Sequence, residues 1–225
     1  MWCVPEITAE YVEKMEDVLA VYERPYNPKE PVVCIDERPL TLHAEAREPV
    51  AARPGRICKR DSEYKRCGTA NAFCAVEPKA GRHFTKITRN RKAPEFAKIV
   101  DKIVRSYPKA KTIHMVMDNL NTHCEKSMKG HFGESMGGRI WKRITPHYTP
   151  KHGSWLNQAE IEISLFSRQC LGKRRIPRIG DVRRQARAWN RRVNREGLKI
   201  DWRFTRRKAR EKFNYTTSTF TRARH

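Results

Sequence analysis

Apolar residues recur at two spacings along the chain, and these spacings predict alternating helices and strands. Residues 7–22 and 93–107 place an apolar side chain every three or four positions, and the second segment has Pro94 near its start and is followed by Pro108. Both are predicted to be amphipathic helices. Residues 157–171 are also predicted to be helical, and so are residues 179–194, whose narrow apolar stripe is surrounded by arginine.

Short continuous apolar runs predict buried strands. Two of these runs, PVVCIDE (31–37) and KTIHMVMDN (111–119), end in an acid. The remaining predicted strands are 68–78 and 82–89, which form a hairpin, and 139–148, which follows a loop containing Gly130, Gly133, Gly137 and Gly138. Residues 40–66 are polar and rich in arginine, which predicts a hairpin or long loop lying over a surface.

This order of elements predicts an α/β fold with a mixed sheet flanked by helices. An N-terminal helix and linker (1–30) precede the sheet domain (31–170), and a basic helical extension (171–212) follows it. Residues 213–225 show no periodicity and are expected to be a disordered tail.

The charge of the chain predicts a polyanionic partner. The formal net charge is +23, and residues 168–212 alone contain 18 Lys or Arg against four acids. Such an imbalance points to a nucleic-acid backbone. The residues expected to contact it are Lys173, Arg174, Arg175, Arg183, Arg184, Arg187, Arg191 and Arg192.

Other compartments and cofactors are disfavoured by the sequence. No segment approaches the roughly 20 apolar residues of a membrane-spanning helix. The N-terminus turns acidic too early for a secretory signal, so an intracellular location is expected. Seven cysteines at irregular spacing, without a C-x-x-C pair, indicate neither a disulfide framework nor a zinc site. Cys34, Cys74 and Cys170 are interpreted as small core residues.

Three acids stand where a fold would direct them to one point. Asp36 and Asp118 each end an apolar strand, and Glu160 falls in the first turn of a predicted helix. Ionised carboxylates this close repel each other, so a divalent cation or a raised pKa is the physical resolution. Oxygen ligands select Mg²⁺, for which Mn²⁺ can substitute. Two such ions would suit phosphodiester chemistry.

Each acid also has a purely structural interpretation. Asp36 or Asp118 alone could cap its own backbone at a strand end. Asn157 and Glu160 have the spacing of a capping box, in which Glu160 satisfies the backbone N–H of Asn157. Glu162 is a rival for the third position, although its place beside Ile161 and Ile163 is typical of a solvated helix face.

Several motifs together resemble a known family. CIDE (34–37), GTANAFCAV (68–76), DNLNTH (118–123) and HYTPKHGSWLNQAEIEISLFSRQCLG (147–172) are similar to the DDE catalytic domain of bacterial insertion-sequence transposases of the mariner-like superfamily. The resemblance spans about residues 5–212. It implies a ribonuclease-H-like DDE catalytic domain over residues 31–170, with Asp36, Asp118 and Glu160 as its catalytic, metal-binding acids.

The resemblance also implies an activity, partners and supporting residues. The implied activity is cut-and-paste cleavage and strand transfer with two divalent ions, and the implied substrates are the element ends and the target DNA. The implied working form is a homodimer or higher oligomer in the bacterial cytoplasm, associated with the nucleoid. Asn119, Asn121, His123, His152 and Asn157 are candidates to support the acids. Trp155 suits core packing and DNA contact equally.

Two departures from the family pattern leave other functions open. The spacing of about 41 residues between Asp118 and Glu160 exceeds the usual one, and the chain starts almost at the catalytic domain, without the family's helix-turn-helix region. A truncated copy is one interpretation. A non-catalytic DNA-binding remnant or regulator of transposition shares the charge but does not need the acids. An RNA-binding protein leaves the strand-end carboxylates unexplained.

Overall fold

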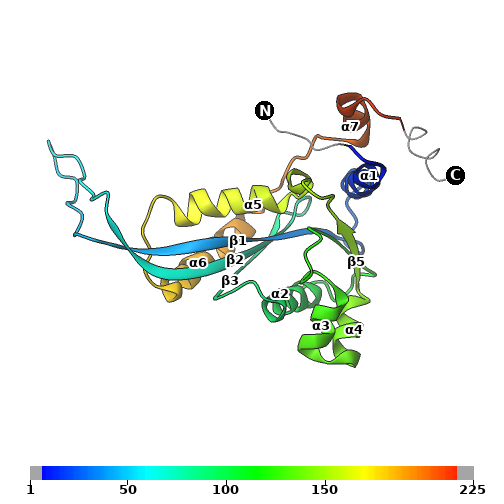
Figure 1. The fold of residues 1–225 in the computed structure, drawn as a ribbon, viewed down its shortest axis with the longest axis horizontal. Coiled ribbons are helices and arrows are strands. Elements are labelled where there is room, and N and C mark those ends of the chain that lie inside the picture. Colours follow the sequence, from blue (N-terminus) through cyan, green and yellow to red (C-terminus); the bar gives the residue numbers. More distant parts are fainter. Residues whose placement is uncertain (1–6, 217–225) are drawn as a thin grey trace.

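A five-stranded sheet in the order β3-β2-β1-β4-β5 forms the centre of the protein (Figure 1). The computed structural model describes residues 7–216. Strands β1 (Val32–Glu45), β2 (Tyr64–Glu77) and β3 (Arg82–Thr88) are antiparallel, whereas β4 (Ile113–Met117) and β5 (Ile144–Tyr148) run parallel to β1. The predicted mixed sheet of an α/β fold is therefore confirmed.

Helices cover both faces of the sheet, because successive strand residues point to opposite sides. Val33, Ile35, Phe73 and Ala75 are buried on one face against α2 (Ala93–Arg105), α3 (Glu125–Phe132) and α4 (Glu134–Trp141). Figure 1 shows these three helices together on that side. Pro94 and the Ile/Val stripe of α2 place this helix as the sequence predicts.

The alternate residues form the second face. Cys34, Cys74 and Val116 are buried there beneath α1 (Ala9–Glu23), α5 (Ala159–Phe166) and α6 (Ile179–Glu196). A one-turn 3-10 helix, Ser154–Leu156, precedes α5, and a π-helical turn, Ser167–Leu171, extends it. The burial of Cys34, Cys74 and Cys170 confirms their interpretation as core residues, and the six cysteines within residues 7–216 are all free.

The predicted glycine-containing loop before β5 is wrong, because residues 125–141 form α3 and α4. Gly133 turns the chain between these helices with a φ of 82°, a conformation that favours glycine. Gly137 lets the two helices approach closely, since a Cβ there would lie 2.5 Å from backbone atoms of Met128 and Lys129. Gly133 thus serves the turn and Gly137 the helix packing, neither of which intrinsic propensity reveals.

Gly137→Ala is expected to lower the free energy of unfolding by about 1–3 kcal/mol or more, because the added methyl group overlaps the backbone of α3. Denaturant unfolding would measure this change. Gly138→Ala is the matched control: its Cβ would meet only the Lys129 and Glu125 side chains, at 3.6 and 3.8 Å. Equal stability of the two variants would contradict the close approach.

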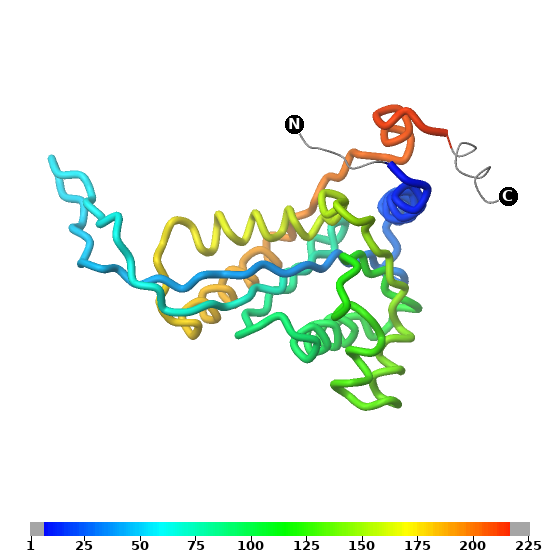
Figure 2. The backbone as a smooth tube through the Cα atoms, viewed as in Figure 1, coloured from blue at the N-terminus to red at the C-terminus, as the bar shows by residue number. Residues whose placement is uncertain are grey.

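Residues 40–66 do not lie over a surface. β1 continues to Glu45 and β2 begins at Tyr64, so that Glu45 pairs with Tyr64 and Leu40 with Ala70. Residues 46–63, here called the arm, connect the two strands and project away from the rest of the chain, as the tube trace in Figure 2 shows. The hairpin alternative is therefore confirmed, and the surface loop is excluded.

Packed structure continues beyond residue 212, where the sequence predicts it to end. Helix α7 (Arg206–Phe213) lies against α1, where Arg210 forms an ion pair of 2.8 Å with Glu16. Tyr215 is buried and its hydroxyl donates to Glu16 at 2.8 Å. The prediction of a disordered tail from residue 213 is thus wrong for Phe213 and Tyr215, and residues 217–225 lie outside the described residues.

Candidate active site

Asp36 and Asp118 occupy equivalent positions on two adjacent parallel strands. β1 pairs with β4 through Val32–His114, Val33–Met115 and Cys34–Val116. Continuing this register places Asp118, the residue after β4, level with Asp36. Because hydrogen-bonded strands lie about 4.8 Å apart, the two carboxylates meet at the same edge of the sheet.

Asp36 is held by backbone and side-chain hydrogen bonds. Its Oδ1 accepts from the Glu37 N–H at 2.7 Å, and its Oδ2 accepts from Asn157 Nδ2 at 3.3 Å. Burial raises the pKa of Asp36 to about 7; the Glu37 N–H opposes this rise, and the negative charges of Glu160 and Asp118 add to it. The three predicted acids therefore belong to one electrostatic site.

Glu160 lies in the first turn of α5, as predicted, and it is exposed. The capping box is not formed, because the Asn157 N–H donates to the Ser154 carbonyl at 2.8 Å. Asn157 instead accepts from the Ala159 N–H at 3.1 Å through its own Oδ1 and donates to the Ile35 carbonyl at 2.9 Å. Asn157 thus connects the start of α5 to β1 beside Asp36. The Glu160 carboxylate does not cap the helix by accepting from the Asn157 N–H.

Glu162 is buried, so its prediction as a solvated residue is wrong. Its side chain is 1% exposed, and its Oε2 lies 2.9 Å from Nδ1 of His83 on β3. Nε2 of His83 lies 2.9 Å from the Leu198 carbonyl oxygen. Glu162 therefore points into the packing between α5, β3 and the segment after α6, whereas Glu160 on the same helix points to solvent.

His123 connects Asp118 to a fourth acid, Glu37, which the sequence interpretation missed. Its Nδ1 lies 2.5 Å from Asp118 Oδ1, and its Nε2 lies 3.3 Å from Glu37 Oε2. Burial lowers the pKa of His123, but the hydrogen bonds to Asp118 and Glu37 outweigh burial and raise the pKa to about 9. The ring stacks on Phe96 at 4.4 Å. The only sequence signal for Glu37 was its place beside Asp36.

The donor set fits a hard divalent cation. The negative charges of Glu160 and Asp118 raise the pKa of Asp36, and a cation would relieve this repulsion. Within residues 7–216 no group of three or more His, Cys, Asp or Glu side chains already has metal-binding geometry. The fit of a divalent cation therefore rests on the carboxylate chemistry of these residues and on the effect of their charges on the pKa of Asp36.

A cleft of about 670 Å³ is lined in part by Asp118. It is lined by the start of α1 and by the loops after β4 and β5, including Tyr11, Lys14, Asn119 and His152. Asn119 and His152 thus line the same cleft as Asp118. Asn121 is exposed in the same loop, and its carbonyl accepts from the Cys124 thiol.

Trp155 packs within the protein. Its Nε1 donates to the Tyr11 hydroxyl at 3.2 Å, and its ring meets Phe204 edge-on at 5.3 Å. Of the two interpretations that suited the sequence equally, these contacts favour core packing.

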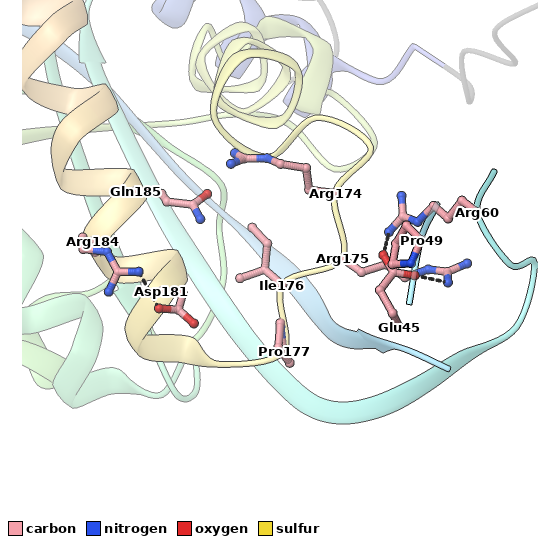
Figure 3. A pocket seen from close by; sticks show the side chains of 10 residues that line it. All are labelled: Glu45, Pro49, Arg60, Arg174, Arg175, Ile176, Pro177, Asp181, Arg184 and Gln185. Atoms are coloured by element: carbon pink, nitrogen blue, oxygen red, sulfur yellow. Dashed lines mark hydrogen bonds and ion pairs between the residues drawn. The ribbon is translucent and has the colours of Figure 1, made fainter. Parts of the chain in front are cut away.

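The predicted DNA-contacting residues divide into two groups. Arg175 donates to Glu45 and to the carbonyls of Asp61, Ser62 and Glu63, so its guanidinium serves the base of the arm. Figure 3 shows Arg174, Arg175 and Arg184 around a groove of about 530 Å³ between the arm and α6. The partners of the remaining paired residues are protein groups as well: Ile87 for Arg183, Asp181 for Arg184, Gln169 for Arg192, and Leu171 and Cys170 for Arg174.

Lys173, Arg187 and Arg191 are exposed and form no ion pair with the rest of the described chain. Arg187 Nε donates to the Arg183 carbonyl at 3.3 Å, so Lys173 and Arg191 are the two of these side chains for which no side-chain partner is found within residues 7–216. No helix within the described residues is long and apolar enough to cross a membrane.

A mixed five-stranded sheet, with Asp36 and Asp118 level on two adjacent parallel strands, has a ribonuclease-H-like fold. The chain belongs to the DDE superfamily endonucleases, because residues 31–183 match the model of that family. A comparison with curated proteins finds no match.

Solved structures similar to this chain share its fold. The Mos1 mariner paired-end complex with Mn has a TM-score of 0.54 and 12% identity, with 98% of this chain and 65% of that chain covered. The mariner Mos1 paired-end complex with Mg also has a TM-score of 0.54 and 12% identity, over 88% and 60% of the two chains. This chain therefore spans less than two thirds of the length of the Mos1 chains.

Proposed function

We propose that this chain is a transposase catalytic domain that cleaves DNA and transfers the cut strand with Mg²⁺ or Mn²⁺. The observation that carries the proposal is the level placement of Asp36 and Asp118, with Glu160 close enough to raise the pKa of Asp36. Membership of the DDE superfamily endonucleases supports it, and so do the names of the similar Mos1 structures, which are paired-end complexes with Mn and Mg.

Asp36, Asp118 and Glu160 would hold two divalent ions. Such ions, when bound, activate the attacking water or 3′-hydroxyl and stabilise the leaving oxygen. The other residues of the site orient these acids. Asn157 donates a hydrogen bond to Asp36, and His123 contacts Asp118 through one ring nitrogen and Glu37 through the other. The cleft beside Asp118 admits the DNA strand.

The proposed setting is the transposition of a bacterial insertion sequence, on DNA of the nucleoid in the cytoplasm. The substrates are then the element ends and the target DNA. Joining two ends requires at least two catalytic centres, so the working form is a homodimer or higher oligomer.

Incubation of the purified chain with supercoiled plasmid tests the proposal. Nicking and strand joining are expected with Mg²⁺ or Mn²⁺ and are expected to stop in EDTA. DNA binding by the folded protein without cleavage under any of these conditions would reject the enzyme and favour a non-catalytic DNA-binding protein.

Arg191→Gln is expected to weaken DNA binding in a salt-dependent way, because Arg191 is exposed on α6 without an ion-pair partner in the described chain. Each lost phosphate contact reduces the slope of log affinity against log salt concentration by about 0.9. Fluorescence anisotropy with a labelled duplex measures that slope. Lys102→Gln, on the opposite face of the sheet, is the control, and equal slopes for the two variants would place Arg191 outside the DNA contact.

A further inference from the structure

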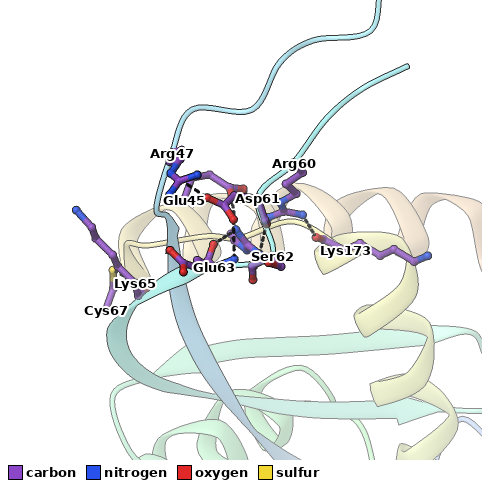
Figure 4. Close-up of polar contacts among 10 residues, drawn as sticks. Glu45, Arg47, Arg60, Asp61, Ser62, Glu63, Lys65, Cys67 and Lys173 are labelled. Carbon is purple, nitrogen blue, oxygen red and sulfur yellow. Dashed lines mark hydrogen bonds and ion pairs between the residues drawn. The ribbon is translucent and has the colours of Figure 1, made fainter. Parts of the chain in front are cut away.

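The arm is fixed firmly at its base. Glu45 forms ion pairs with Arg60 at 2.5 Å and with Arg175 at 2.6 Å, and Arg47 lies 3.4 Å from Asp61. Arg60 also donates to the Lys173 carbonyl at 2.6 Å, in the linker before α6 (Figure 4). The arginines at the base are therefore committed to protein partners, and together they hold the arm against the linker that follows α5.

The rest of the arm has no packing to hold it. Every residue from 47 to 60 is exposed, including Val50 at 57% and Ile57 at 79%. Two isolated bridges, Val50–Lys59 and Arg53–Arg56, are its only strand pairing, around a turn at Gly55 with a φ of 74°. Since an extended residue advances about 3.3 Å, the arm reaches up to about 30 Å beyond Glu45. Figures 1 and 2 show it standing clear of the other elements.

The cations at the tip, unlike those at the base, have no acidic partners. Residues 47–60 contain five cations against one acid, Glu48. Arg53, Arg56 and Lys59 have no ion-pair partner among residues 7–216, and the Arg53–Arg56 bridge brings two like charges together. Such a group of unpaired cations on a projecting ribbon is complementary to a polyanion.

We propose that the arm is a DNA-binding element, whose tip cations Arg53, Arg56 and Lys59 contact phosphates of a duplex away from the catalytic acids. The inference rests on the proposed function, in which DNA is the substrate. A two-stranded ribbon is narrow enough for the major groove of B-DNA, with phosphates on both sides of it. The groove lined by Arg174 and Arg184, which also contains Glu45 and Asp181, lies between the arm and α6. The base contacts of Glu45 and Arg175 fix the direction in which the tip reaches.

Substitution of the three tip cations tests this inference. The variant Arg53→Gln/Arg56→Gln/Lys59→Gln is compared with Lys102→Gln/Lys109→Gln/Lys111→Gln, which removes the same charge from exposed positions around the end of α2. Binding of a labelled duplex is measured by anisotropy over a range of salt concentrations in EDTA. In the tip variant, the slope of log affinity against log salt concentration is expected to decrease in magnitude by up to about 2.7, which is 0.9 for each lost phosphate contact. In the control variant, this slope is expected to decrease by less than about 1.

Equal slopes for the two variants would overturn the inference. Sedimentation analysis of both variants tests the competing partner: a loss of self-association in the tip variant, with the DNA slope intact, would assign the arm to a second copy of the chain and also overturn the inference. Binding in EDTA requires no cleavage, so absence of plasmid nicking would reject the proposed enzyme while leaving the result for the arm intact. A wild-type chain that binds no DNA would reject both.

Discussion

Replacing Asp118 by asparagine is expected to abolish metal-dependent plasmid nicking, with a loss of about a thousand-fold or more. Metal ions contribute several kcal/mol to transition-state stabilisation in such sites, and each 1.36 kcal/mol corresponds to a factor of ten in rate. An asparagine cannot replace the charge of a carboxylate ligand. Glu160→Gln should cause a loss of the same order, because Glu160 lies in the first turn of α5 and its negative charge raises the pKa of Asp36.

Both substitutions should leave the fold and DNA binding in EDTA intact. Asp118→Asn leaves unchanged the backbone carbonyl that accepts from His123 at 3.3 Å, and Glu160 is exposed, so neither change opens a cavity. Thermal unfolding and anisotropy in EDTA provide these controls. Nicking that persists in either folded variant would remove that acid from the catalytic site.

The strands that carry the two aspartates were predictable because their signal is local. VVCID and IHMVMD are apolar runs, which must be buried in a sheet. Asp118 directly follows β4, as predicted, but the predicted strand end at Asp36 is wrong, because β1 continues to Glu45. The first-turn position of Glu160 follows in the same way from the residues that precede α5. The level register of Asp36 and Asp118 could not be read from the sequence, since it depends on which strands become neighbours.

Contacts distant in sequence explain what the sequence did not predict. The base of the arm depends on Arg175, which is more than 100 residues from Asp61 and Glu63. Helices α3 and α4 depend on a close backbone approach at Gly137, where intrinsic propensity argues against a helix. Glu37 becomes a partner of His123 only when β1 and the loop after β4 meet. In each case a long-range contact decides the role of a residue with a weak local signal.

Glu162→Ala is expected to lower the free energy of unfolding by about 1–5 kcal/mol, because it leaves a buried hydrogen-bonding group without its partner, at about 1–3 kcal/mol for a neutral pair and 3–5 kcal/mol for an ionised one. Nε2 of His83 faces a carbonyl oxygen and must donate to it, so Nδ1 either donates to an ionised Glu162 or accepts from a protonated one. In both states, loss of the Glu162 carboxyl group leaves Nδ1 without its partner in a site of 1% exposure. Denaturant unfolding of the variant and the wild type measures the cost.

Glu162→Gln separates this structural role from catalysis. The glutamine amide can donate to Nδ1 of a neutral His83 while Nε2 still donates to Leu198, so most of the stability should return. Nicking by Glu162→Gln should also stay within a few-fold of wild type, whereas Glu160→Gln, two residues away on the same helix, should be inactive. If Glu162→Gln instead lost nicking at unchanged stability, Glu162 and not Glu160 would be the third acid of the site.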